Sequence, residues 1–191
     1  MELYIARHDE TEFNAQRRYQ GGGQDSPLTA NGRTQAKALG ETLAGIEFDA
    51  VYSSPLKRAV DTVEIAFEGR YKPILDSRLV EIGMGVVEGM YWEEVEAAYP
   101  DCRIFDPVNH VPPPQGENLV DMIARIGSFM DDISKAGHQK VFVLAHGYVL
   151  RVFEACVMDR TVEAIAKARA YGNCEVARYM VKDGVWAGKG S

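Results

Sequence analysis

Residues 4–14 read YIARHDETEFN, and this stretch joins a strand to a polar cluster. The apolar residues 2–6 predict a short buried strand, which stops at Arg7 and His8. Two acids, Asp9 and Glu10, follow at once. A cation, an imidazole and two carboxylates at the tip of a buried strand mark this junction as the first candidate for a functional site.

The segments on either side of this junction alternate between strand and helix patterns. Strands are predicted at residues 48–54, 140–147 and 174–187, the last region turning at Asp183-Gly184. Helices are predicted after Thr29, from Ser54-Pro55, at residues 91–99, from Glu117 to Gly137, from Tyr148 and near residues 161–170. The alternation predicts a three-layer α/β/α fold with a mostly parallel central sheet.

Three predicted strands end in polar residues. In a parallel sheet such ends share one edge, where ligands bind and helix N-termini favour anions. Arginine forks match phosphate oxygens, so the set predicts a phosphate pocket. Each member alone has a structural interpretation: a lone strand-end histidine is usually structural, and a helical arginine is usually at the surface. The three clusters are Arg7-His8, Ser53-Ser54 with Arg58, and His146-Gly147.

A metal site is the alternative interpretation of the same residues. His8, Asp9, Glu10 and His146 carry suitable donor atoms. Their spacing fits no common ligand pattern, and Arg7 would repel a cation. We therefore expect no metal.

Composition limits the remaining possibilities. The 191 residues suit one domain with a small cap over residues 85–118, where Pro107 and Pro112-Pro113-Pro114 stiffen a loop. A net charge of −7 argues against nucleic-acid or anionic-membrane binding. The three cysteines, at positions 102, 156 and 174, show no CxxC spacing. Without a leader pattern or a membrane-length apolar run, we expect a cytoplasmic protein.

Ordered blocks along the chain resemble the histidine phosphatase superfamily, also called the phosphoglycerate mutase-like family. Any one block is weak evidence, but the ordered set is specific and extends over nearly the whole chain. The blocks are Arg7-His8-Asp9-Glu10-Thr11 with Asn14, Arg18-Tyr19-Gln20-Gly21, residues 25–29, SSPLKRAVDT (53–62), Leu79-Val80-Glu81 with Gly85 and Glu88-Gly89, Gly116-Glu117, and VLAHGYVLR (143–151).

The resemblance implies a role for each matched residue. His8 would be the nucleophile that becomes phosphohistidine, and Glu81 would donate a proton to the leaving group. Arg7, Arg58 and His146 would hold the phosphoryl oxygens. The resemblance also implies a substrate-binding set made of Arg7, Asn14, Arg18, Gln20, Gly21, Arg58 and Gly147, with no cofactor.

Asp9 departs from the family pattern, which has glycine after the nucleophilic histidine. Asp tolerates left-handed backbone geometry, so the turn is expected to survive. We expect its carboxylate to point away from the phosphate.

The family contains both phosphatases and phosphoglycerate mutases. The compact chain and its EIGMGVVEG segment resemble the phosphatases, so we expect a histidine acid phosphatase-type phosphomonoesterase. The alternatives are a cofactor-dependent phosphoglycerate mutase and a catalytically impaired phosphate-binding module. The expected partner is a small phosphomonoester. The protein is expected to be a monomer or a homodimer. Tyr91, Trp92, Phe105 and His110 either line an entrance for a ring-bearing group or pack the cap.

Overall fold

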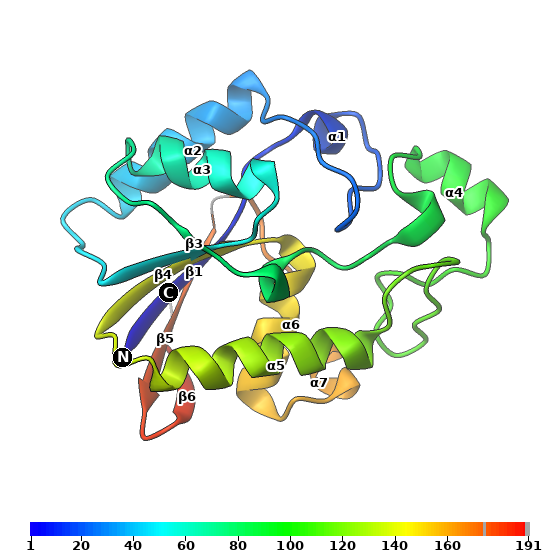
Figure 1. Cartoon of the computed structure of the whole chain (residues 1–191). Helices are drawn as coiled ribbons and strands as arrows, with labels where there is room; N and C mark the ends of the chain where they lie inside the picture. Colours follow the sequence, from blue (N-terminus) through cyan, green and yellow to red (C-terminus); the bar gives the residue numbers. More distant parts are fainter. Residues whose placement is uncertain (174, 190–191) are drawn as a thin grey trace.

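A six-stranded sheet forms the centre of the computed structural model, which describes residues 1–173 and 175–189 (Figure 1). Its strand order is β3-β2-β4-β1-β5-β6. The first four strands pair in parallel, and β5 pairs antiparallel with both β1 and β6. The mostly parallel sheet expected from the sequence is confirmed. The strands are β1 Glu2–Arg7, β2 Ala50–Ser53, β3 Ile74–Leu75, β4 Lys140–Ala145, β5 Val176–Lys182 and β6 Val185–Lys189.

Helices cover both faces of the sheet, which confirms the three-layer arrangement. In Figure 1, α2 and α3 lie above the sheet, and α5, α6 and α7 lie below it. The α-helices within the described residues are α1 Glu12–Ala15, α2 Ala30–Thr42, α3 Lys57–Ala66, α4 Trp92–Ala98, α5 Leu119–Lys135, α6 Gly147–Met158 and α7 Val162–Lys167. Two short 3-10 helices, η1 Ser77–Leu79 and η2 Gly85–Val87, precede α4.

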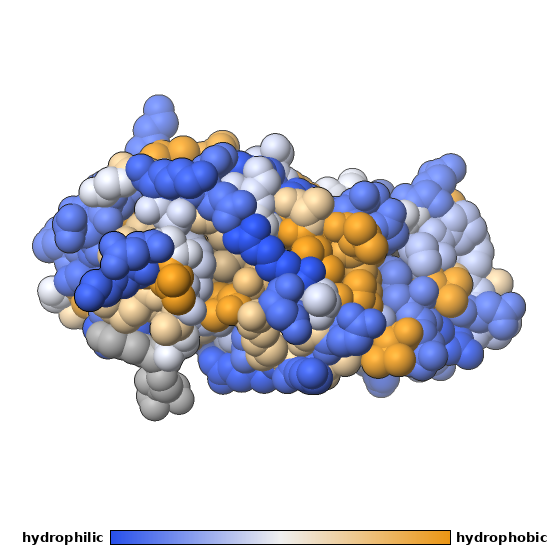
Figure 2. Space-filling view, turned by 90° about the horizontal axis from the view of Figure 1, so that it is seen from below, coloured by the Kyte–Doolittle hydropathy of each residue, from blue (hydrophilic) through white to orange (hydrophobic). Residues whose placement is uncertain are grey.

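The alternation of side chains along β1 divides the core in two. Leu3 and Ile5 pack with residues of α5 and α6, whereas Tyr4 and Ala6 pack with residues of α2 and α3. Successive strand residues point to opposite faces, so an apolar strand that is buried on both sides needs a helix on each. The helix-bearing side that Figure 2 shows from below is mostly hydrophilic, with apolar side chains gathered in patches.

Two helices begin later than the sequence predicts. The helix expected from Ser54-Pro55 begins at Lys57, because the Asp25 carboxylate accepts a hydrogen bond from the Lys57 N–H. The helix expected from Glu117 begins at Leu119, because the Asn118 side chain caps it by accepting from the Asp121 N–H at 2.8 Å. Glu117 pairs with Arg125 instead.

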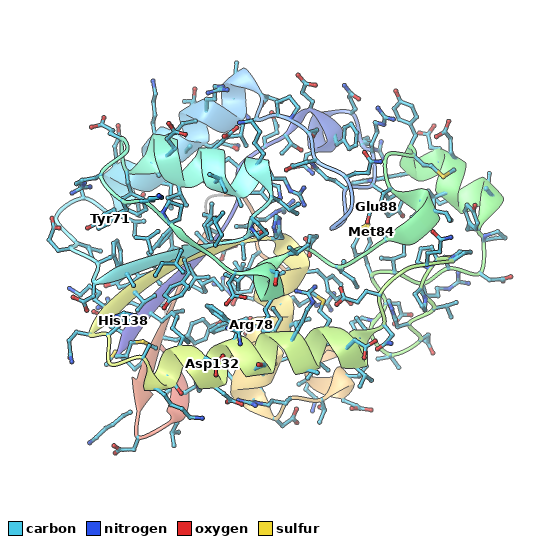
Figure 3. The ribbon with its side chains drawn as sticks, in the orientation of Figure 1. Tyr71, Arg78, Met84, Glu88, Asp132 and His138 are labelled. Atoms are coloured by element: carbon cyan, nitrogen blue, oxygen red, sulfur yellow. The ribbon has the colours of Figure 1, made fainter. Side chains whose placement is uncertain are left out.

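The predicted cap segment, residues 85–118, carries η2 and α4 and leads away from the sheet toward α1 (Figure 1). Its base is held by Glu88, which accepts the Met84 N–H at 2.9 Å (Figure 3). A short bridge also joins Arg18 to Tyr91. The segment therefore closes one side of the edge where β1, β2 and β4 end.

Ion pairs fix the loop after β3 to α5. Arg78 in η1 reaches Asp132 at 2.6 Å (Figure 3). Arg125 of α5 donates to the Arg78 carbonyl and pairs with Glu117. These contacts position the segment that carries Glu81.

The N-terminus of α2 approaches the loop after β1 very closely. A Cβ at Gly32 would lie 2.1 Å from the carbonyl oxygen of Glu10, so only glycine fits there. The Thr29 hydroxyl, which caps α2, donates to the Glu10 carboxylate at 2.6 Å. The polar loop that follows His8 is thus pinned to a helix.

Candidate active site

His8 lies at the carboxyl end of β1 and is 3% exposed. Its backbone N–H donates to the Ala145 carbonyl at 3.0 Å, which continues the β1–β4 pairing. The ring Nδ1 lies 2.7 Å from the Asp9 carbonyl oxygen. A carbonyl only accepts, so Nδ1 carries the proton and Nε2 keeps its lone pair. The ring is therefore held in a defined orientation, with a free lone pair on Nε2.

The surroundings of His8 keep it neutral. Burial lowers the pKa of this imidazole well below its ordinary value, and the positive charges of Arg58 and Arg7 lower it further. A protonated ring would have no lone pair for attack. Burial and the two guanidinium groups thus favour the neutral ring and keep its Nε2 lone pair free.

His146 lies beside His8 because β4 pairs with β1. The two ring centroids are 5.1 Å apart, at an interplanar angle of 61°. His146 Nε2 lies 2.8 Å from the Ser54 hydroxyl, and that hydroxyl also accepts the Leu56 N–H at 3.3 Å. Ser54 can then donate its own hydrogen to Nε2, which leaves the proton of a neutral ring on Nδ1. Burial lowers the pKa of His146 well below its ordinary value.

Three buried nitrogen atoms at this edge have no hydrogen-bond partner among the described residues. They are Arg7 Nε, Arg58 Nε and His146 Nδ1. A buried donor without a partner costs free energy, so such a group of donors indicates a ligand that accepts hydrogen bonds. The guanidinium charges make an anion the natural acceptor.

Arg58 is fully buried, and its terminal nitrogens are already engaged. They donate to Asp25, to the Gln24 carbonyl and to the Gly21 carbonyl, each at 3.0 Å. Asp25 thereby joins the start of α3 to the loop after α1. The Nε of Arg58 has no partner among the described residues and can donate to a ligand.

Glu81 is the acidic group of the site and follows η1. Its two oxygens accept the Ile82 N–H at 2.9 Å and the Tyr148 N–H at 3.3 Å. Burial raises the pKa of this carboxyl above its ordinary value, although both hydrogen bonds and the charges of Arg58 and Arg7 oppose that shift. Glu81 can therefore hold a proton at a pH where an exposed glutamate is ionised.

A cavity of about 310 Å³ opens onto this edge. Arg7, Glu81 and Gly147 line it and adjoin His8 and His146. Trp92 and Phe105 of the cap segment line it too, as the sequence suggested, whereas Tyr91 contacts the Arg18 guanidinium. The sequence assigned no site role to the other wall residues, which are Tyr19, Met84, Tyr148, Arg151, Ala170 and Tyr171.

The substrate-binding candidates differ in their positions. Asn14, Arg18 and Gln20 line the cavity. The Asn14 side chain also accepts the Thr11 N–H, and Arg18 Nε donates to the Gly89 carbonyl. Gly21 contributes its carbonyl to Arg58.

Asp9 is fully buried next to His8. Its backbone N–H lies 3.5 Å from the Thr62 hydroxyl, which acts as acceptor. Asp9 is not among the described non-glycine residues with positive φ, so the left-handed geometry considered from the sequence does not occur. The direction of its carboxylate stays a prediction.

The described residues offer neither a metal-binding cluster nor a helix suited to a membrane. Within residues 1–173 and 175–189, no group of three or more His, Cys, Asp or Glu side chains could hold a metal ion. In the same part of the chain, no helix has both the length and the apolar character that crossing a bilayer requires. Cys102 and Cys156 are free thiols, and Cys174 lies outside the described residues.

Comparisons with known proteins agree with this geometry. A model of the histidine phosphatase superfamily (branch 1) matches residues 3–190. Phosphoserine phosphatase 1 of Hydrogenobacter thermophilus is 33% identical over 95% of the chain and 85% of its own length. A probable phosphoglycerate mutase GpmB of Proteus mirabilis is 30% identical over 100% and 89%. The structure of Bacillus stearothermophilus YhfR matches with a TM-score of 0.88 and 32% identity, over 98% of this chain and 94% of its own.

Proposed function

The chain belongs to the histidine phosphatase superfamily, and from this premise we propose that it hydrolyses a small phosphate monoester through a phosphohistidine on His8. Phosphatases stand among its relatives. The pocket of unpartnered nitrogens supports a phosphoryl group beside the ring. The assigned nucleophilic atom is His8 Nε2.

The proposed reaction has two steps. His8 Nε2 attacks phosphorus while the ester P–O bond breaks, and protonated Glu81 gives its proton to the departing alkoxide. Water then attacks the phosphohistidine, Glu81 takes a proton from that water, and the P–N bond breaks to release phosphate. Arg7, Arg58 and His146 would neutralise the charge on the phosphoryl oxygens in both steps.

The opposite pKa shifts of His8 and Glu81 carry this proposal. Burial lowers the pKa of the His8 imidazole and raises the pKa of the Glu81 carboxyl, so the pH ranges that favour a neutral ring and a protonated carboxyl move toward each other. That pairing of a nucleophile with an acid is what ester cleavage requires. A purely phosphate-binding module has no need of a protonated carboxyl facing the anion.

Hydrolysis of p-nitrophenyl phosphate with and without EDTA tests the proposal. We expect turnover that survives EDTA, and its loss to background in His8→Ala, with unfolding monitored to show that the variant is folded. Acid-labile, base-stable phosphate on wild-type protein quenched during turnover would identify the intermediate. Wild-type turnover by His8→Ala, or turnover abolished by EDTA, would refute the mechanism.

A phosphoglycerate mutase is the second candidate. It is favoured by the GpmB relative, which covers the whole chain and is named a probable mutase. The same His8 could pass its phosphoryl group to a bound phosphoglycerate instead of to water. An assay of 3- to 2-phosphoglycerate conversion beside phosphate release separates the two: a mutase isomerises the substrate without a matching release of phosphate.

A further inference from the structure

Aromatic side chains form the outer wall of the cavity above the phosphoryl site. Five aromatic residues line it, and four of them, Tyr19, Trp92, Phe105 and Tyr148, lie next to one another; the fifth is Tyr171. We propose that the alcohol half of the substrate is a flat, ring-bearing group that packs against these side chains. The proposal rests on the phosphatase function and narrows its substrate class.

Ring geometry supports a flat ligand. Tyr19 and Phe105 stack with centroids 5.9 Å apart and planes within 11° of parallel. Trp92 lies 6.3 Å from Tyr19, and Tyr148 lies 6.0 Å from Phe105. Aromatic surfaces bind other rings best by offset stacking or edge contacts at such distances. The four rings therefore form a continuous wall that one more ring could contact.

Exposure of the two cap aromatics supports the same conclusion. Phe105 is 50% exposed and Trp92 is 40% exposed, although both border a concave site. Apolar surface that lines a cavity marks a place where an apolar ligand group is removed from water. A compact, fully hydrated alcohol would leave this surface wet.

Tyr148 adds a polar contact at the bottom of the wall. Its side chain is almost fully buried, and its hydroxyl has no hydrogen-bond partner among the described residues. A hydroxyl in that position can bond a polar atom of the ligand. The substrate class is thus a ring with a polar atom on the side that faces α6.

Two arginines in the same cavity suggest a competing ligand, a compact alcohol with its own negative charge. Both guanidinium groups lie near aromatic rings, Arg18 at 4.5 Å from Phe13 and Arg151 at 5.9 Å from Tyr148. Both Nε atoms donate to backbone carbonyls, of Gly89 and of Ile165. These contacts hold both arginine side chains against the cavity wall, which favours a ring-bearing ligand. The test therefore includes a ligand with a carboxylate as the competing possibility.

Calorimetric titration with three phosphonates, which cannot be hydrolysed, separates the possibilities. They are propylphosphonate, 3-phenylpropylphosphonate and 4-phosphonobutyrate, which carry no group, a ring or a carboxylate at the end of the same three-carbon chain. We expect the phenyl compound to bind at least about tenfold more tightly than propylphosphonate, since it buries a ring. Phe105→Ala and Trp92→Ala should each reduce that ratio severalfold. Val108→Ala, a highly exposed apolar site in the same segment, should leave it unchanged.

Equal binding of the phenyl and propyl compounds would overturn the inference. So would tighter binding of the carboxylate compound than of the phenyl compound. Neither result would touch the phosphatase proposal, because p-nitrophenyl phosphate turnover is measured separately on the same preparation. Absence of that turnover, with the phosphonate preference intact, would instead refute the proposed hydrolysis and leave the ring-binding wall standing.

Discussion

At the scale of single residues, Glu81 makes the sharpest prediction because its role depends on the leaving group. Glu81→Gln keeps the shape of the side chain and removes its acidic proton. We expect kcat to fall by about a hundredfold to ten-thousandfold on an alkyl phosphate, whose alkoxide needs that proton. On p-nitrophenyl phosphate the first step should suffer much less, because nitrophenolate leaves without help. Parallel kinetics on the two esters measure this difference.

The pH profile gives a second readout for the same variant. Since burial raises the pKa of Glu81, wild-type kcat should decline on the alkaline side as the carboxyl ionises. Glu81→Gln should lack that decline on the alkyl ester. Equal losses on both esters together with an unchanged profile would assign Glu81 a structural role only.

Ser54 is a positioning residue whose effect passes through His146. Ser54→Ala removes the donor to Nε2, so the His146 ring is free to place its proton there and to present a lone pair to the anion. We expect inhibition by inorganic phosphate to weaken about tenfold, in line with the loss of a hydrogen bond to a charged group. Ser54→Thr keeps a hydroxyl and should restore most of the affinity.

Nitrogen chemical shifts of His146 test the assignment directly. Wild-type protein should show the Nδ1-protonated form, and Ser54→Ala should show the other tautomer or a mixture. An unchanged tautomer with unchanged phosphate inhibition in Ser54→Ala would contradict the positioning role.

These residues also mark what the sequence could and could not predict at this scale. The strand-end rule brought His8 and His146 to one edge, because parallel neighbours align their ends. Ser54 was assigned to one of the polar clusters and to the start of a helix, because a Ser-Pro pair is a local signal. Its partner in the fold, His146, lies 92 residues away. Asp25, which accepts the Lys57 N–H at the start of α3, lies 32 residues away. Local patterns carry no information on such pairings.

At the scale of elements, two glycines inside helices predict opposite responses to the same substitution. A Cβ at Gly40 of α2 would lie 2.1 Å from the Ala66 carbonyl oxygen of α3, so Gly40→Ala must push the two helices apart. Overpacking of this kind costs about 1–3 kcal/mol. At Gly127 of α5 the nearest atom is the flexible guanidinium of Arg160, at 3.3 Å. Gly127→Ala should therefore be neutral or gain up to about 1 kcal/mol from helix propensity.

Urea unfolding of both variants measures this contrast. Activity is measured on the same variants as a control. Gly40→Ala should lower it, because α2 and α3 flank the loops that carry the site, whereas Gly127→Ala on α5 should not. Equal free energies of unfolding for the two variants would show that α2 and α3 can separate without cost.

Element types were easier to predict than element starts. The apolar period of α5 is visible in the sequence, and its apolar side is buried in the core. The start was misplaced by two residues because Glu117 matches a first-turn acid but is engaged by Arg125. The aromatic wall was only partly predicted: Tyr19 and Tyr148 belong to other segments, and only the tertiary fold brings them to the cap.

At the scale of the whole molecule, the local charge at the site has the opposite sign to the net charge of the chain. The chain carries −7 overall, yet a buried Arg58 and a half-buried Arg7 lie beside two buried histidines whose pKa is lowered well below its ordinary value. Local cations can therefore attract an anion to an acidic protein, because nearby charges in a poorly solvated site act more strongly than distant surface charges. Because the two histidines are buried, their protonation also affects the free energy of unfolding of the whole protein.

The buried histidines predict that stability falls below pH 6.5. In the unfolded chain His8 and His146 bind protons near their ordinary pKa, whereas burial keeps them neutral in the fold. The unfolded state then binds more protons, so the free energy of unfolding decreases as the pH drops through 6.5. Between pH 6.5 and 5.5 each histidine should account for about 1 kcal/mol. Glu81, with its raised pKa, acts in the opposite direction at lower pH. Urea unfolding at both pH values measures how far the free energy of unfolding decreases. The decrease should be smaller in His8→Asn than in the wild type, and smaller still in His8→Asn/His146→Asn. Equal decreases in all three proteins would mean that the folded state binds these protons.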